Sequence, residues 1–267
     1  MKKTHFLTGI LFVATLAVFS IPSSPALASS DTGLGADKEW SVTVDLTYSS
    51  KYIWRGLNFN DDGVVWPSVA YSWNGFSASL WASIETSDYN VYPDNATPSG
   101  DITEVDYTFS YTFPVDKFSF TVGLALYEYP TTGLDNTMEL FAVASYDTYL
   151  SPTISVYQDV DEAEGTWISL SASHSFDLWT LEGGQTLSLT ISGGIGFGTS
   201  QHNEYYFGLA ESSLTDLTLH ATLPFQISET WCVTLSFNYA TLLDSDNRQI
   251  MAKDDNFWTT LSITATF

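Results

Sequence analysis

The stretch Phe257-Trp258-Thr259-Thr260-Leu261-Ser262-Ile263-Thr264-Ala265-Thr266-Phe267 closes the chain and decides the fold. Its odd positions are mostly apolar and its even positions are mostly hydroxylated, so a strand here would present two unlike faces. A period of two over about ten residues is the length and pattern of a strand that crosses the outer-membrane hydrocarbon core. The sequence therefore predicts a transmembrane β-strand that ends at Phe267.

The same alternation recurs along most of the chain. Twelve candidate strands follow from it: 40–49, 65–73, 76–85, 102–113, 117–128, 137–146, 153–157, 166–176, 186–194, 217–225, 231–239 and 257–267. They predict an all-β fold, an antiparallel up-and-down transmembrane β-barrel of about twelve strands, because closure removes the sheet edges that lipid cannot satisfy. Counts of ten and fourteen also fit the pattern. A secreted soluble β-sandwich that binds a ligand, with its aromatic residues between two sheets, is a further alternative.

The connections between these strands alternate in length. Residues 74–75 and 114–116 form short turns, and Asn74-Gly75 suits a two-residue type I′ hairpin. The longer connections are 50–63, 87–101, 196–212 and 241–256. Short inner turns and longer outer loops are typical of outer-membrane barrels, and an even strand count puts both chain ends on the periplasmic side.

The first residues have the pattern of an export signal. Lys2 and Lys3 precede an apolar run over 6–21, and Ala26-Leu27-Ala28 provides a small-residue cleavage site. We expect a secretory signal peptide over 1–28, a short N-terminal segment over 29–39 and the barrel over 40–267. The alternative, a transmembrane anchor, fits less well because prolines follow the run. The expected location is the outer membrane of a Gram-negative bacterium.

Composition excludes several classes of function. Residues 29–267 keep all 31 acidic and six of the eight basic residues, a net charge of about −25, which makes nucleic acid an improbable partner. Cys232 is the single cysteine, so neither an intrachain disulfide nor a cysteine metal cluster can form. We expect no cofactor. The expected partners are lipid, lipopolysaccharide, small solutes and the barrel-assembly machinery, which would read Phe267.

Charged residues at lumen-facing positions are candidates for a pore lining. The strand parity places five carboxylates inside the barrel: Asp45, Glu85, Glu104, Asp106 and Glu139. Such a lumen would attract cations, or its carboxylates would merely keep it wet. Lys51 and Arg55 lie in the first long loop. We expect Arg55 to fold into the mouth and pair with a lumen carboxylate such as Asp45 or Glu104, either as a constriction or as a structural ion pair.

The region around Arg55 resembles a known family. The segment Ser50-Lys51-Tyr52-Ile53-Trp54-Arg55-Gly56 is similar to the Ser-x-Tyr-x-x-Arg-Gly opening of the TorF-like outer-membrane porins, through Ser50, Tyr52, Arg55 and Gly56. The hairpin over 66–83 looks like that family as well, whereas the second half departs from it. The resemblance implies an outer-membrane location and a channel role. It implies no particular solute.

Other chemistries have weaker patterns. His174 and Ser175 are adjacent on a strand and therefore face opposite sides, so they make no phospholipase-like pair, and we expect no enzyme. His202 and His220 are isolated, and His220 fits a lumen wall. No metal centre is expected, although the acidic residues of the first and last loops could hold divalent cations: Asn58, Asn60, Asp61, Asp62, Asp244, Asp246, Asn247, Asp254, Asp255 and Asn256. The glycines of 193–198 are expected to bend a strand near the rim.

These observations lead to one functional expectation. The chain should be a porin-like channel for passive diffusion of small solutes, with a modest preference for cations. A non-conducting barrel with a structural or adhesive task is the alternative. The sequence does not name the solute, the oligomeric state, or whether the lumen is open.

Overall fold

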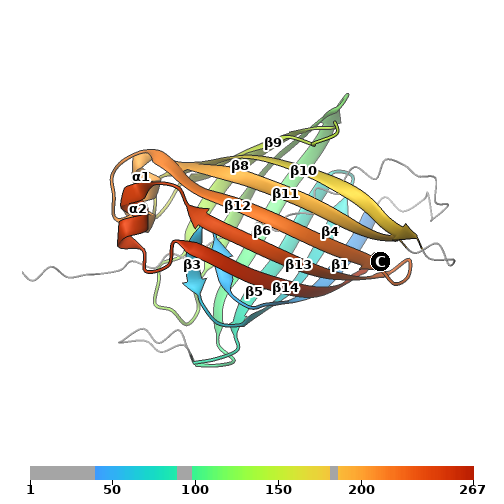
Figure 1. Cartoon of the computed structure of the whole chain (residues 1–267), viewed down its shortest axis with the longest axis horizontal. Helices are drawn as coiled ribbons and strands as arrows, with labels where there is room; N and C mark the ends of the chain where they lie inside the picture. Colours follow the sequence, from blue (N-terminus) through green and yellow to red (C-terminus); the bar gives the residue numbers. More distant parts are fainter. Residues whose placement is uncertain (1–39, 89–97, 181–185) are drawn as a thin grey trace, which may run out of the picture.

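A computed structural model describes residues 40–88, 98–180 and 186–267. The expected signal peptide over 1–28 and the segment over 29–39 lie outside the described residues. Figure 1 shows a single barrel, with helices α1 (Ser200–Phe207) and α2 (Ser245–Ile250) at one end and the C-terminus at the other. We call these the loop end and the turn end.

The wall is a closed antiparallel barrel of twelve strands, in the order β1-β14-β13-β12-β11-β10-β9-β8-β7-β6-β5-β4. The strands are β1 (Trp40–Ser49), β4 (Val64–Trp73), β5 (Phe76–Glu85), β6 (Ile102–Val115), β7 (Phe118–Glu128), β8 (Thr137–Tyr146), β9 (Thr153–Asp159), β10 (Thr166–Thr180), β11 (Thr186–Gly198), β12 (Ser213–Gln226), β13 (Trp231–Leu242) and β14 (Asp255–Thr266). All twelve predicted strands are confirmed, and the alternatives of ten strands, fourteen strands or a sandwich are wrong.

The barrel closes where the last strand meets the first. β14 pairs with β1 through residues such as Leu261 opposite Tyr48 and Ala265 opposite Val44. Two backbone bonds extend this seam, from Phe267 N to Val42 O at 2.9 Å and from Val42 N to Phe267 O at 3.2 Å. The terminal residue therefore belongs to the closure.

The turns mostly follow the prediction. Asn74 and Gly75 have φ of 47° and 84°, as the expected type I′ turn requires. The turn expected at 114–116 is wrong by two residues, because Val115 still pairs with Phe118 and the connection is Asp116-Lys117. Proline lacks a donor, but the end of a strand tolerates it. The glycine-rich part of β11 has a register shift against β12 between Ile195 and Phe197, and the expected bend stays a prediction.

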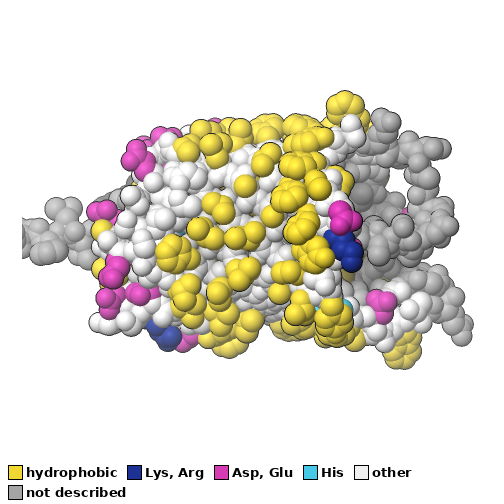
Figure 2. Space-filling view, turned by 90° about the horizontal axis from the view of Figure 1, so that it is seen from above, with side chains coloured by type: hydrophobic (Ala, Val, Ile, Leu, Met, Phe, Trp, Pro, Cys, Tyr) yellow, Lys and Arg dark blue, Asp and Glu magenta, His cyan; other side chains and the backbone are white. Residues whose placement is uncertain are grey.

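The two faces of the wall meet different surroundings. Val44, Leu46 and Tyr48 of β1 are exposed on the outside, whereas Asp45 and Thr47 point inward. Figure 2 shows apolar side chains spread over the visible face of the wall, with acidic side chains mainly at the loop end and some at the turn end. The alternation in sequence thus reflects an apolar exterior and a polar interior.

The loops contain short elements that the sequence pattern did not predict. β2 (Tyr52–Trp54) and β3 (Leu57–Asn60) form a hairpin within the first long loop, and α1 and α2 lie in the two long loops that flank β12 and β13. Among the described residues, no helix is long and apolar enough to cross a membrane. The hairpin β2–β3 occupies the barrel mouth, and the candidate site is built around it.

Candidate functional site

The hairpin β2–β3 turns at Arg55 and Gly56. These two residues have φ of 41° and 82°, so both are left-handed, as a two-residue type I′ turn requires. Trp54 pairs with Leu57 across the turn, and Tyr52 pairs with Asn60 at the base. The Arg-Gly dipeptide therefore makes the sharp tip of a short hairpin.

The tip packs against the barrel wall at β12 and β13. A Cβ atom on Gly56 would lie 2.7 Å from Asp216 Cβ of β12 and 2.8 Å from Leu242 Cδ2 of β13. The hairpin follows β1 directly in the chain, yet the Arg55 side chain reaches Glu139 on β8, across the lumen. The buried side chains of the hairpin are at most 5% exposed. The hairpin thus crosses and fills the lumen near the loop end.

Arg55 is held by charge and by aromatic rings. Its Nη1 and Nη2 donate to the two carboxylate oxygens of Glu139, each at 2.9 Å, and Tyr127 also donates to Glu139 at 3.1 Å. The guanidinium carbon lies 4.2 Å from the ring centre of Trp54 and 4.4 Å from that of Trp167. Burial lowers the pKa of Arg55, but the neighbouring Glu139 carboxylate outweighs burial and raises that pKa above its usual value. The pair is a bidentate, stacked ion pair in a low-dielectric setting.

Further polar contacts hold the body of the hairpin. The Tyr52 hydroxyl donates to Glu104 Oε2 at 2.7 Å, and the Asn60 amide donates to Glu85. Asn58 donates to Asn256 Oδ1 at 2.8 Å. At the rim, Asp61 forms ion pairs with Lys51 at 2.7 Å and with Lys253. These contacts join the hairpin to β5, β6 and β14 as well as to β8.

Helix α1 packs beside the hairpin. The rings of Tyr206 and Trp54 lie 5.1 Å apart, and His202 stacks near Tyr206 at 4.5 Å. His202 Nδ1 and Asn203 Oδ1 are 3.0 Å apart. Burial, assisted by the charge of Arg55, lowers the pKa of His202 to about 3, so the ring is neutral at ordinary pH. The helix therefore adds a neutral, mostly aromatic side to the packing.

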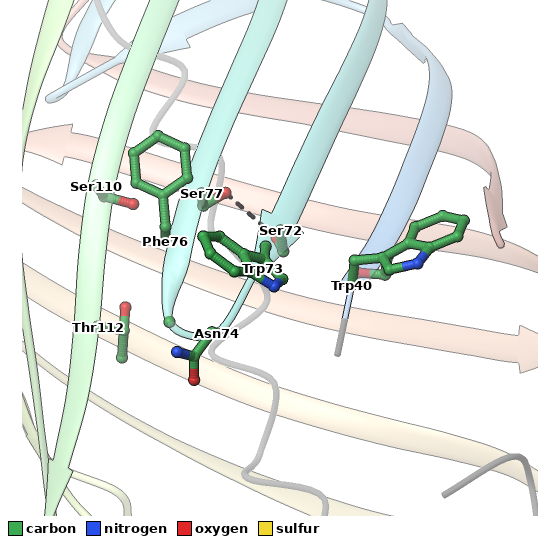
Figure 3. A pocket seen from close by; sticks show the side chains of 10 residues that line it. Trp40, Ser72, Trp73, Asn74, Phe76, Ser77, Ser110 and Thr112 are labelled. Carbon is green, nitrogen blue, oxygen red and sulfur yellow. Dashed lines mark hydrogen bonds between the residues drawn. The ribbon is translucent and has the colours of Figure 1, made fainter. Parts of the chain in front are cut away.

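The two halves of the lumen differ in character. Aromatic side chains fill the loop half: Tyr52, Trp54, Trp81, Tyr127, Tyr157, Trp167 and Tyr206. The turn half carries small hydroxylated side chains, and a cavity of about 320 Å³ lies there. Figure 3 shows this cavity, with Ser72, Ser77 and Ser110 near the Asn74 turn and with Trp40 at its edge. The inner wall of this turn half is hydroxylated, and we call the space that it encloses the polar vestibule.

The predicted pore residues lie inside the barrel but not in one cluster. Asp45 lies apart from the hairpin and accepts hydrogen bonds from Thr47 and Thr264, both at 2.7 Å. Glu85, Glu104, Asp106 and Glu139 are buried around the hairpin. Arg55 does enter the mouth, but the expected partner, Asp45 or Glu104, is wrong: Glu139 holds the guanidinium. Glu139 is the partner of Arg55 because its strand faces the hairpin tip, whereas Glu104 faces the base of the hairpin.

The four residues that carry the resemblance to the TorF-like porins each hold the hairpin. Ser50 Oγ accepts from the Thr259 backbone N–H at 3.0 Å, Tyr52 bonds to Glu104, Arg55 bonds to Glu139, and Gly56 provides the left-handed tip. The motif thus encodes a hairpin that folds inward. Sequence reasoning missed Trp54, Tyr157, Trp167 and helix α1. The bulky aromatic residues at lumen-facing positions near the loop ends of strands, such as Trp81 and Trp167, were the available signal.

The other candidate residues have structural partners. His174 Nδ1 lies 2.6 Å from the Tyr149 carbonyl oxygen, and His220 contacts Asn238 inside the barrel. In the last loop, Asp244 caps helix α2 through the Asp246 and Asn247 amides. Asp254 and Asp255 form ion pairs with Arg248. Within the described ranges, no group of three or more His, Cys, Asp or Glu residues could hold a metal ion.

Comparisons with known proteins agree with the fold. No family model matches the sequence, and no curated protein matches it. Among solved structures, a KdgM porin is similar with a TM-score of 0.53 and 12% identity, over 84% of this chain and 99% of that chain. A KdgM porin in complex with disordered oligogalacturonate has a TM-score of 0.52 and 11% identity, over 85% and 99%. At this identity the likeness establishes the barrel fold, and the resemblance to the TorF-like porins stays a prediction.

Proposed function

We propose that this chain is a channel of a bacterial outer membrane for passive diffusion of small solutes, with its outer mouth narrowed by the hairpin β2–β3. The observation that carries the proposal is a closed transmembrane barrel with a hydroxyl-lined half, into which one loop inserts a hairpin. A barrel that served only as an anchor would have no need of a polar vestibule. The fold shared with KdgM porins supports the same reading.

A modest preference for cations follows from the lumen charges. Arg55 is the one buried Lys or Arg among the described residues, and Glu139 neutralises it. Within the described ranges, no ion pair joins a cation to four other buried carboxylates: Glu104, Asp106, Asp159 and Asp216. Their summed field would favour cations and disfavour anions in the narrow part of the pore.

The proposal includes the cellular setting. An export signal over 1–28, an apolar exterior and a terminal strand that ends in Phe267 fit outer-membrane insertion by the barrel-assembly machinery. The acidic rim at the loop end would then face the outside, next to lipopolysaccharide. A channel of this kind needs no cofactor and performs no catalysis.

A second function is favoured by a specific observation. Most side chains of the hairpin are buried, so the loop half of the barrel is packed like a protein core. If the hairpin never moves, the barrel is a non-conducting structural or adhesive protein, and its outer loops carry the function.

The experiment is planar-bilayer recording of the refolded protein under a salt gradient. We expect small discrete conductance steps and a reversal potential of cation-selective sign. Arg55→Ala should change the step size or the ion preference, because it removes the charge that crosses the lumen. A folded, inserted protein that gives no steps in either form would overturn the channel and favour the second function.

A further inference from the structure

Two acidic residues of β6 lie under the hairpin, and neither forms an ion pair with a described residue. Glu104 and Asp106 are two positions apart, so they share the inner face of the strand. Their exposed fractions are 1% and 4%. Neighbouring positions on one face bring the two carboxyl groups together beneath the hairpin, and Tyr52 of the hairpin donates to Glu104 Oε2 at 2.7 Å.

This pair cannot be stable as two carboxylates. Carboxylates only accept hydrogen bonds, and accordingly Glu104 Oε1 and Asp106 Oδ1 have no donor among the described residues. Buried charges require a partner, and the guanidinium of Arg55 is already bound to Glu139. A proton on Asp106, donated to Glu104, removes one charge and gives one of these oxygens a partner.

The titratable groups that face the pair from the described elements bring it no free cation. From the hairpin, β7, the residues after it and β8, they are Tyr52, Tyr127, Tyr129 and Glu139. The tyrosines are uncharged, Arg55 is committed to Glu139, and Glu139 adds repulsion. Nearby on β5, Glu85 bonds to Asn60 and Thr103. Release of the proton would therefore place unpaired negative charge directly beneath Tyr52.

We propose that Glu104 and Asp106 share one proton and that this acid pair is a pH-sensitive lock on the hairpin β2–β3. In the protonated state the pair anchors Tyr52 and keeps the mouth closed. When the proton leaves at higher pH, the two carboxylates repel each other and draw water, which displaces the hairpin. This inference rests on the proposed channel function for its effect on transport, but the shared proton itself does not depend on transport.

The variant Asp106→Asn tests the lock. An amide at this position donates permanently to Glu104, as the protonated acid does, so the hairpin should stay seated at every pH. We expect the wild-type conductance to rise several-fold from acidic to alkaline pH and the Asp106→Asn conductance to stay low throughout. Asp45→Asn is the matched control, because Asp45 is a lumen carboxylate with two hydroxyl donors of its own. It should keep the wild-type pH response.

Infrared spectroscopy separates this inference from the channel function. The wild type and Asp45→Asn at neutral pH should show the carbonyl band of a buried protonated carboxylic acid, and Asp106→Asn should lack it. Absence of that band in the wild type, or its persistence in Asp106→Asn, overturns the shared proton whether or not the protein conducts. If the band behaves as expected but conductance is identical at all pH values, the lock is wrong and the acid pair is structural. If the protein shows the expected infrared band but gives no conductance at any pH, the proposed channel function is wrong, and so is the gating role of the acid pair.

Discussion

At the scale of single residues, the Arg55–Glu139 pair determines whether the hairpin stays in the lumen. Arg55→Ala leaves Glu139 buried without its cation, and breaking a buried pair in this way costs about 3–5 kcal/mol. Because the variant destabilises only the conformation in which the hairpin is inserted, the hairpin should leave the lumen more often. We expect trypsin to cleave after Lys51 in folded Arg55→Ala protein and to leave the wild type intact there.

Arg248→Ala is the control for this experiment, because it removes an ion pair that is about 41% exposed on the arginine side. Exposed pairs contribute little to stability, so the hairpin should remain protected. Equal protection of Lys51 in wild type and Arg55→Ala would show that the pair does not hold the hairpin.

His202 should make the loop end sensitive to acid. Its folded pKa of about 3 lies below the ordinary value of 6.5, so the unfolded chain takes up a proton first as pH falls. The contribution to stability is therefore complete above pH 6.5 and is lost toward pH 3, at about 1.4 kcal/mol per pH unit. We expect the melting temperature in detergent to fall less between pH 7 and pH 4 in His202→Phe than in wild type. Identical acid sensitivity would contradict a buried neutral imidazole.

The scarcity of Lys and Arg in this chain makes the position of Arg55 predictable from sequence. The sequence predicts that Arg55 enters the barrel mouth, and the structure places it there. Its partner was not predictable, since Glu104 and Glu139 have the same inward parity and only the three-dimensional path of the hairpin distinguishes them. The roles of Trp167 and Tyr157 depend on that same path.

At the scale of elements, the hairpin requires glycine at its tip. Gly56 has φ of 82° and lies against Asp216 and Leu242, so a methyl group would be strained and would also overlap both side chains. Gly56→Ala should cost more than the roughly 1–2 kcal/mol of the left-handed backbone alone. We expect faster hydrogen exchange over residues 50–63 in this variant than in wild type.

Gly208→Ala separates the two causes. Gly208 also has a positive φ, of 73°, but nothing lies within 4 Å of its missing Cβ. This variant should leave exchange over 50–63 unchanged. Unchanged exchange in Gly56→Ala as well would mean that the tip does not contact Asp216 and Leu242.

The wall strands could be predicted, whereas the elements inside the mouth could not. A strand such as β5 (Phe76–Glu85) separates lipid from a polar lumen. Apolar and polar residues therefore alternate along it, and this alternation can be recognised in the sequence. β2 and β3 have three and four residues, too few for any periodicity. α1 and α2 are similarly short, with eight and six residues.

At the scale of the whole molecule, Phe267 contributes to the closing seam. Deleting it removes both backbone bonds to Val42, so closure of β14 on β1 should be slower. We expect delayed appearance of the heat-modifiable folded band during refolding into lipid vesicles. Phe267→Leu keeps the backbone bonds and should fold faster than the deletion. If the deletion folds at the wild-type rate, the seam does not need its last residue.

The central claim is that a transmembrane channel is narrowed by one inserted hairpin. The most direct measurement compares single-channel conductance of the wild type with that of a variant in which residues 52–60 are replaced by a short Gly-Ser linker. The barrel wall is unchanged in this variant, and heat-modifiable migration verifies that it folds. The account predicts a clearly larger conductance in the variant, because the polar vestibule then opens through both ends. Equal conductance, or silence in both folded proteins, would contradict it.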